Sequence, residues 1–136
     1  MRVIRHAESR RTETPNAVMT TLASPTQGGA GQAVWRVDMR PGQQGPPHAI
    51  DTEQVWTVLA GGATVELDGE MIDIEPGDTV VIPADVPRRV NADPAAGFAA
   101  IVVAPAGTRA YTLDDTRVSP ECAVPDGDKL VPAWVV

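Results

Sequence analysis

Short runs of β-favouring residues, separated at regular intervals by Gly, Pro, Asp and Asn, fill most of this chain between about residues 17 and 103. Such spacing is typical of a sandwich or barrel, and no segment has the periodicity of a long amphipathic helix. At 136 residues the chain has the length of one domain. We therefore predict an all-β domain. The expected strands are residues 17–22, 33–39, 54–59, 63–67, 71–74, 78–82, 87–91 and 98–103.

The dipeptide Asp68-Gly69 gives the sharpest local prediction. A two-residue type I′ turn needs positive φ at both central residues, and Asp-Gly supplies it at low steric cost. The turn fixes the strand register and places one set of apolar side chains on a single face. The predicted pairs are Leu67–Glu70, Glu66–Met71, Val65–Ile72, Thr64–Asp73 and Ala63–Ile74.

Composition excludes several partners. The net charge of -7 argues against nucleic acid, whose binding is driven by cations that neutralise phosphates. No apolar run is long enough to cross a bilayer. The basic residues near the start have no apolar segment after them, so they do not form a signal peptide. We expect a cytoplasmic protein that binds neither nucleic acid nor membranes.

The single cysteine, Cys122, cannot form an internal disulfide. It lies among Pro, Asp and Gly residues that predict a loop, and no histidine is near it in sequence. We favour an incidental thiol over a catalytic nucleophile.

The stretch from Gly42 to Gly61, GQQGPPHAIDTEQVWTVLAG, resembles the first motif of the cupin superfamily, G-x5-H-x-H-x3,4-E-x6-G. The glycines and His48 have the spacing of the motif. Ile50 stands where the motif has its second histidine, and Gln54 stands where it has its glutamate.

A second stretch, GDTVVIPADVPRRVNA at residues 77–92, resembles the other cupin motif, G-x5-P-x-G-x2-H-x3-N. Pro83 keeps its place, whereas Asp85 replaces the glycine, Arg88 the histidine and Ala92 the asparagine. The predicted hairpin separates the two motifs, as the family architecture requires.

The resemblance covers about residues 30–103 and implies a cupin double-stranded β-helix, a jelly-roll-like barrel. We assign residues 25–104 to the barrel, residues 1–24 to an N-terminal arm that can act as a dimer strand, and residues 105–136 to a loop-like tail that packs on the barrel. Trp134 in this tail is expected to pack over the barrel or a partner subunit. Family resemblance also implies a homodimer.

Cupins typically bind Fe, Mn, Ni or Zn through three histidines and a carboxylate, and some relatives use glutamine. Here only His48 is a standard ligand and Gln54 a weaker one, because Ile50 has no donor atom and Arg88 is cationic. The only other histidine, His6, lies in the arm. We predict no bound metal and no other cofactor.

Strand alternation predicts which side chains face the barrel interior. Apolar side chains in that interior, joined by a few polar groups, would build a small-molecule site. The predicted ligand-binding residues are Trp35, Val37, Met39, Ile50, Trp56, Val58 and Val90. Plainer readings stay open: the tryptophans can be core residues, His48 a hydrogen-bonded remnant, and Arg88 turned outward or paired with Asp85 or Glu53.

The residues predicted to act on a substrate are His48, Arg88 and Gln54. A guanidinium can hold a carboxylate, phenolate or enolate oxygen, an imidazole with an ordinary pKa near 6.5 can move a proton, and Gln54 can orient the substrate. This chemistry is an isomerisation, cyclisation or dehydration of an acidic, enolisable or aromatic, polyketide-like molecule. Metal-free sugar epimerases and polyketide cyclases occur among cupins. The alternatives are a non-catalytic small-molecule binding protein and a metal-dependent dioxygenase with ligands from outside the motifs.

Overall fold

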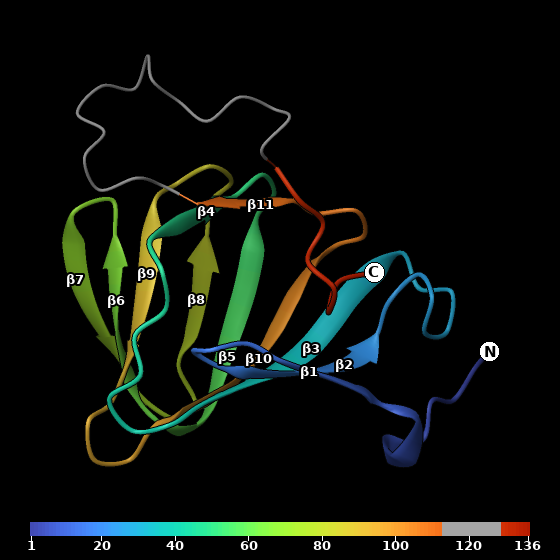
Figure 1. Cartoon of the computed structure of the whole chain (residues 1–136), viewed down its shortest axis with the longest axis horizontal. Helices are drawn as coiled ribbons and strands as arrows, with labels where there is room; N and C mark the ends of the chain where they lie inside the picture. The colour runs from blue at the N-terminus through green and yellow to red at the C-terminus, as the bar shows by residue number, and fades with distance from the viewer. Residues whose placement is uncertain (113–128) are drawn as a thin grey trace.

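The computed structural model describes residues 1–112 and 129–136, and its regular structure is almost entirely β-strand (Figure 1). One 3-10 turn, His6–Glu8, precedes the strands. The strands are β1 Arg10–Glu13, β2 Val18–Ala23, β3 Gln32–Met39, β4 His48–Ile50, β5 Gln54–Gly61, β6 Ala63–Leu67, β7 Glu70–Ile74, β8 Thr79–Ile82, β9 Arg88–Ala92, β10 Phe98–Pro105 and β11 Ala110–Thr112.

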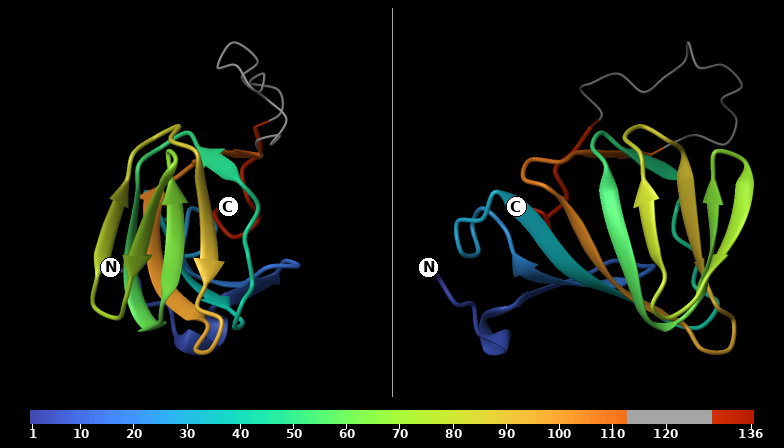
Figure 2. Two further views of the ribbon diagram at one scale, coloured as in Figure 1. Left: turned by 90° about the vertical axis from the view of Figure 1, so that its left-hand side faces the viewer. Right: turned by 180° about the vertical axis from the view of Figure 1, so that it is seen from behind.

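The strands form two antiparallel sheets that face each other (Figure 2). One sheet has six strands in the order β1-β2-β3-β10-β5-β8, and the other has five in the order β11-β4-β9-β6-β7. Apolar side chains from both inner faces meet between the sheets and form one core. The prediction of an all-β, jelly-roll-like barrel is confirmed. Nowhere in the described residues is there a helix long and apolar enough to cross a membrane.

Each predicted strand corresponds to an observed one, but three observed strands were not predicted. β1 is the polar sequence RRTE, whose composition carries no apolar alternation. β4 and β11 have three residues each and pair with each other, from His48–Thr112 to Ile50–Ala110. The tail that we expected to be a loop therefore contains a strand, because a long-range partner supplies its hydrogen bonds.

The predicted hairpin between β6 and β7 is confirmed in its register, from Leu67 opposite Glu70 to Ala63 opposite Ile74. The two turn residues have positive φ, 48° at Asp68 and 83° at Gly69. Local turn chemistry was sufficient here because the turn alone sets which residues oppose each other.

Gly61, the last residue of the first motif, permits a close approach of two chain segments at the end of β5. Its φ is +69°, and a Cβ atom built on it would lie 2.0 Å from the carbonyl oxygen of Gly97. Any larger residue at this position would collide with backbone rather than with a movable side chain.

The N-terminal residues join the barrel of their own chain. β2 pairs with β3, and β1 pairs with β2 at the outer edge of the six-stranded sheet. The sheet therefore begins before the boundary at residue 25 that the sequence suggested. Dimerisation through this arm stays a prediction. Cys122 lies outside the described residues, and its assignment also stays a prediction.

Candidate functional site

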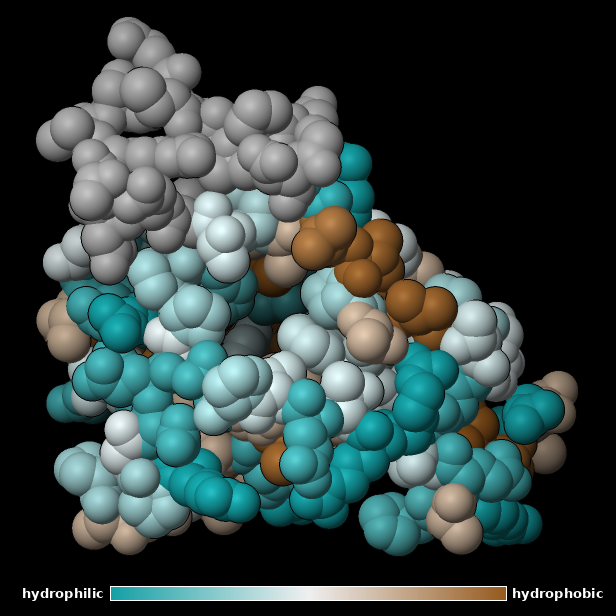
Figure 3. Space-filling view, viewed as in Figure 1, coloured by the Kyte–Doolittle hydropathy of each residue, from teal (hydrophilic) through white to brown (hydrophobic). Residues whose placement is uncertain are grey.

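A cavity of about 550 Å³ lies between the two sheets. Its walls come from the inner faces of β3 and β5, from β4 and β11, from the turn between β1 and β2, and from residues 130–135. Figure 3 shows a hollow in the face of the molecule that is turned to the viewer. All three tryptophans of the chain line the cavity: Trp35, Trp56 and Trp134. Aromatic and aliphatic side chains thus dominate its surface.

The structure places eight of the ten predicted site residues in the cavity wall. They are Trp35, Val37, Met39, His48, Ile50, Gln54, Trp56 and Val90. Val58 is buried in the core and is not part of this wall. Arg88 points inward but lies behind the wall, with 2% of its surface exposed. On the opposite face of β3, Arg36 and Asp38 form a surface ion pair at 3.0 Å.

Gln54 is the central polar residue of the wall. Its side-chain oxygen Oε1 accepts a hydrogen bond from Trp56 Nε1 at 3.0 Å and another from Arg88 Nη1 at 3.2 Å. The residue is only 3% exposed. Alternation along β5 explains the first contact, because residues two apart on a strand share a face.

Three neutral oxygen atoms hold the Arg88 side chain. Besides Gln54, Nε donates to the carbonyl of Val86 at 3.1 Å and Nη2 donates to that of Pro83 at 3.0 Å. No ion pair to Arg88 is formed within the part of the chain that the structure describes, so neither Asp85 nor Glu53 is its partner there. Burial lowers the pKa of Arg88 to about 10, so it is still a cation at neutral pH.

This arrangement changes the role expected for Arg88. A guanidinium behind the wall, bonded to three protein oxygens, is not placed to grip a substrate oxygen directly. It remains a buried positive charge beside the cavity. Gln54, which bonds to Arg88 and lines the cavity, lies between this charge and the cavity.

His48 lies at the start of β4, opposite Arg88 on β9. Its Nδ1 is 2.8 Å from the carbonyl oxygen of Pro46. Because a carbonyl oxygen only accepts, Nδ1 carries the hydrogen and Nε2 of the neutral ring has a free lone pair. Nε2 makes no hydrogen bond with any described residue, and the ring belongs to the cavity wall.

The ordinary pKa that we expected for His48 is wrong. Burial lowers the pKa of the imidazole, and the positive charge of Arg88 lowers it further, while the hydrogen bond to Pro46 acts in the opposite direction. The net shift is downward, so the ring is neutral and can act as a base at neutral pH. Sequence reasoning missed this because the burial of His48 depends on how β4 packs.

Tyr111 on β11 is a wall residue that sequence reasoning missed. Its hydroxyl donates to Asp85 Oδ1 at 2.9 Å. Burial, followed by this hydrogen bond and the negative charge of Asp85, raises the pKa of Tyr111 to about 12. The phenol is therefore a hydrogen-bond donor at neutral pH. Its only sequence signal was a lone aromatic residue in a tail that was expected to be irregular.

The C-terminal segment covers one side of the cavity. The carbonyl of Trp134 accepts a hydrogen bond of 2.7 Å from Thr21 Oγ1 on β2, and Val135 is fully buried in the core. Figure 3 shows apolar atoms gathered where Figure 1 draws this segment. Trp134 thus packs on the barrel of its own chain.

The motif positions do not fit the metal ion that the family implies. Ile50 has no donor atom, Arg88 is a cation, and the Gln54 oxygen already accepts two hydrogen bonds. That leaves His48 Nε2 as a single ligand, where metal sites need three or four. Across residues 1–112 and 129–136, no group of three or more His, Cys, Asp or Glu side chains could hold a metal ion.

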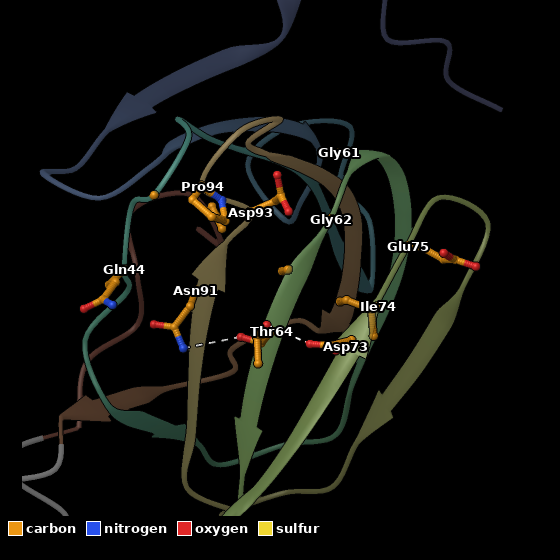
Figure 4. A pocket seen from close by; sticks show the side chains of 13 residues that line it. Gln44, Gly61, Gly62, Thr64, Asp73, Ile74, Glu75, Asn91, Asp93 and Pro94 are labelled. Carbon is orange, nitrogen blue, oxygen red and sulfur yellow. Dashed lines mark hydrogen bonds between the residues drawn. The ribbon is translucent and has the colours of Figure 1, made fainter.

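A second hollow, of about 570 Å³, lies elsewhere on the molecule beside β6, β7 and β9 (Figure 4). Several polar side chains that line it already have hydrogen-bond partners. Asn91 donates to Glu66, outside the lining, at 2.9 Å and to the backbone carbonyl of Thr64, and the Thr64 hydroxyl donates to Asp73 at 2.8 Å. None of the described residues that line it is a histidine or an aromatic residue. The cavity around His48 and Gln54 is therefore the stronger candidate.

Together the barrel, the two motif segments inside it and the interior cavity define a jelly roll of the cupin class. The Cupin domain family matches residues 35–104, and the chain belongs to this family. Cupin homologues bind small-molecule ligands or substrates. No curated protein matches the sequence.

Solved structures with the same fold have diverse functions. The polyketide cyclase RemF from Streptomyces resistomycificus is 22% identical with a TM-score of 0.68, covering 85% of this chain and 88% of RemF. A cupin 2 domain-containing protein from Halorhodospira halophila is 20% identical with a TM-score of 0.69, covering 76% and 74%. A salicylate 1,2-dioxygenase from Pseudoaminobacter salicylatoxidans, as a gentisate adduct, is 22% identical with a TM-score of 0.65, covering 76% of this chain and 30% of that one. At these identities the likeness establishes the fold alone.

Proposed function

We propose that the chain binds an acidic, enolisable or aromatic small molecule in this cavity and acts on it as a cofactor-independent isomerase or cyclase. The observation that carries the proposal is the state of His48. A neutral imidazole with Nδ1 fixed by Pro46 and Nε2 free borders an apolar cavity with tryptophan walls. The fold likeness to a polyketide cyclase supports the choice of substrate class, although fold alone does not determine activity.

The proposed step is a proton transfer next to a carbonyl group. Nε2 of His48 takes a proton from the α-carbon, the C–H electron pair forms the enolate, and the imidazole becomes an imidazolium. Return of that proton to another atom completes an isomerisation. In a cyclisation the enolate carbon instead attacks a second carbonyl, and the alkoxide that forms there takes the proton back from the imidazolium. A lowered pKa keeps His48 in its basic form at neutral pH.

Arg88 and two tryptophans serve this step. The positive charge of Arg88 favours the developing enolate over the neutral ketone, since opposite charges attract strongly in a site shielded from water. Trp35 and Trp56 supply flat apolar surfaces for an aromatic substrate. His48 is therefore the proposed catalytic residue, and Arg88 acts at a distance.

Hydrogen exchange of β-tetralone, a bicyclic enolisable ketone, tests the proposal. In D₂O the protein should make deuterium enter at the α-carbon faster than buffer alone does. Proton NMR measures this exchange as the loss of the α-proton signal. Because general acid–base catalysis contributes roughly a factor of 10² or more, His48→Gln should remove nearly all of the acceleration. The rate should rise with pH to a plateau with a midpoint below about 6.5.

His6→Gln is the matched control, since His6 is the only other histidine and is exposed outside the cavity. It should exchange at the wild-type rate. Binding of β-tetralone without exchange would overturn the catalytic proposal and favour a non-catalytic binding protein. Metal analysis of protein purified without chelator tests the metal-free proposal. Stoichiometric Fe, Mn, Ni or Zn that is absent from the His48→Gln variant would overturn this proposal and favour a dioxygenase. The cytoplasmic location and the homodimer stay predictions.

A further inference from the structure

The two hydrogen bonds to Gln54 Oε1 determine which end of its amide faces the cavity. Both partners, Trp56 Nε1 and Arg88 Nη1, are donors without acceptor capacity. Rotating the amide by half a turn would direct its NH₂ group at two other N–H groups, one of them charged. The oxygen is therefore held towards Trp56 and Arg88, and the nitrogen points elsewhere.

The Gln54 nitrogen borders open space. No hydrogen bond among the described residues uses Nε2 as a donor. The fully buried side-chain atoms without a partner in that part of the chain are Arg10 Nε and Asn91 Oδ1, so Nε2 is not sealed inside the protein. Gln54 lines the cavity and is otherwise almost completely buried. The space that Nε2 reaches is therefore the cavity.

We infer that Gln54 is the specificity-determining residue of this site, and that its Nε2 donates a hydrogen bond to a carbonyl, carboxylate or phenolate oxygen of the ligand. This inference rests on the proposed small-molecule function. Arg88 is a positioning residue: it fixes the amide and polarises it, since a cation at Oε1 draws electron density away from the N–H groups. A ligand with an acceptor oxygen satisfies Nε2, whereas a hydrocarbon of the same shape leaves it unpaired.

Two fluorinated probes with the same number of non-hydrogen atoms test the inference: para-fluoroacetophenone has an acceptor oxygen, and para-fluoro-α-methylstyrene has a CH₂ group in its place. Fluorine NMR titration gives both dissociation constants with wild-type protein and variants. One hydrogen bond in a shielded site changes affinity roughly three- to tenfold, so the wild type should prefer the ketone by about that factor. Gln54→Glu replaces the donor with an oxygen that repels the ketone while keeping an acceptor for Trp56 and Arg88. This variant should abolish the preference for the ketone and leave the affinity for the probe without oxygen within about twofold of the wild-type value.

Gln32→Glu supplies the matched control, because Gln32 is exposed at the start of β3 and carries the same chemical change. It should retain the preference. Arg88→Met should lower ketone affinity selectively, by freeing the amide to rotate, whereas damage to the fold would weaken both probes equally. Equal affinity of the wild type for the two probes, or a ketone preference that survives Gln54→Glu, overturns the inference about Gln54. Absence of saturable binding by either probe overturns the proposed small-molecule site itself.

Discussion

Replacing Gln54 with methionine removes an acceptor from two buried donors while nearly preserving side-chain volume. Trp56 Nε1 loses its partner at 3.0 Å, and Arg88 loses one of its three. Each donor left without an acceptor costs about 1–3 kcal/mol. The additional apolar surface that methionine buries offsets about 1 kcal/mol of this loss in stability. We expect a net loss of about 3 kcal/mol in the free energy of unfolding, within about 1–5 kcal/mol.

Urea unfolding followed by far-ultraviolet circular dichroism measures this loss. The transition midpoint should fall while the slope m stays constant, because the surface exposed on unfolding is unchanged. Gln54→Glu should be less destabilising than Gln54→Met, because a carboxylate keeps both hydrogen bonds and gives Arg88 a counter-charge. The exposed Gln32→Met should stay within about 0.5 kcal/mol of the wild type. A loss below about 0.5 kcal/mol for Gln54→Met would show that the network does not hold these side chains.

Three further predictions concern the backbone and two titrating groups. Gly61→Ala should lower the free energy of unfolding by well over the roughly 1–2 kcal/mol expected for a positive φ alone, because the new Cβ meets backbone at 2.0 Å. Gly69→Ala, with φ +83° and open space around it, should lose only the amount due to φ. The midpoints of urea unfolding compare the two variants. Tyr111 is the only tyrosine, so tyrosinate absorbance reports its titration, and in the folded protein its pKa should be about 12. Asp85→Asn should lower that pKa. A wild-type midpoint near 10 would contradict the burial and the hydrogen bond of Tyr111. The pKa of His48 is lower in the folded protein than the value of about 6.5 in the unfolded chain, so between these two values the unfolded chain binds more protons. The free energy of unfolding should therefore fall as the pH drops through this range, and His48→Gln should reduce that dependence. An unchanged pH dependence of unfolding would contradict the lowered pKa.

The sequence was sufficient where local chemistry decides the structure. Asp68-Gly69 sets the hairpin register because a two-residue turn permits few geometries. The alternating pattern of β5 places Gln54 and Trp56 on the inner face because the side-chain period of a strand is two.

The rest depended on contacts between distant segments. Tyr111 joins the cavity wall only because β11 finds β4 as a partner, and Trp134 joins it because its carbonyl bonds to β2. Neither pairing leaves a pattern in the sequence that is strong enough to read. The direction of the Arg88 guanidinium likewise follows from the oxygen atoms around it, and strand alternation specifies only the face on which Arg88 lies.

The placement of Arg88 gives the altered motif a coherent physical role. Direct contact between an arginine and a bound anion would require the guanidinium to be exposed whenever the cavity is empty, where water would weaken its field. Behind Gln54 the cation is almost completely buried and is held by three neutral oxygens, although the charge of Asp85 acts on it from nearby. The amide between the cation and the cavity is neutral, so an empty cavity exposes no charged group of this network, yet its N–H groups are polarised in the direction that an enolate or carbonyl oxygen needs. On this view the substitutions at the second histidine and the glutamate of the first motif act together: Ile50 keeps the cavity apolar, and Gln54 gives the buried charge of Arg88 access to a ligand without exposing it.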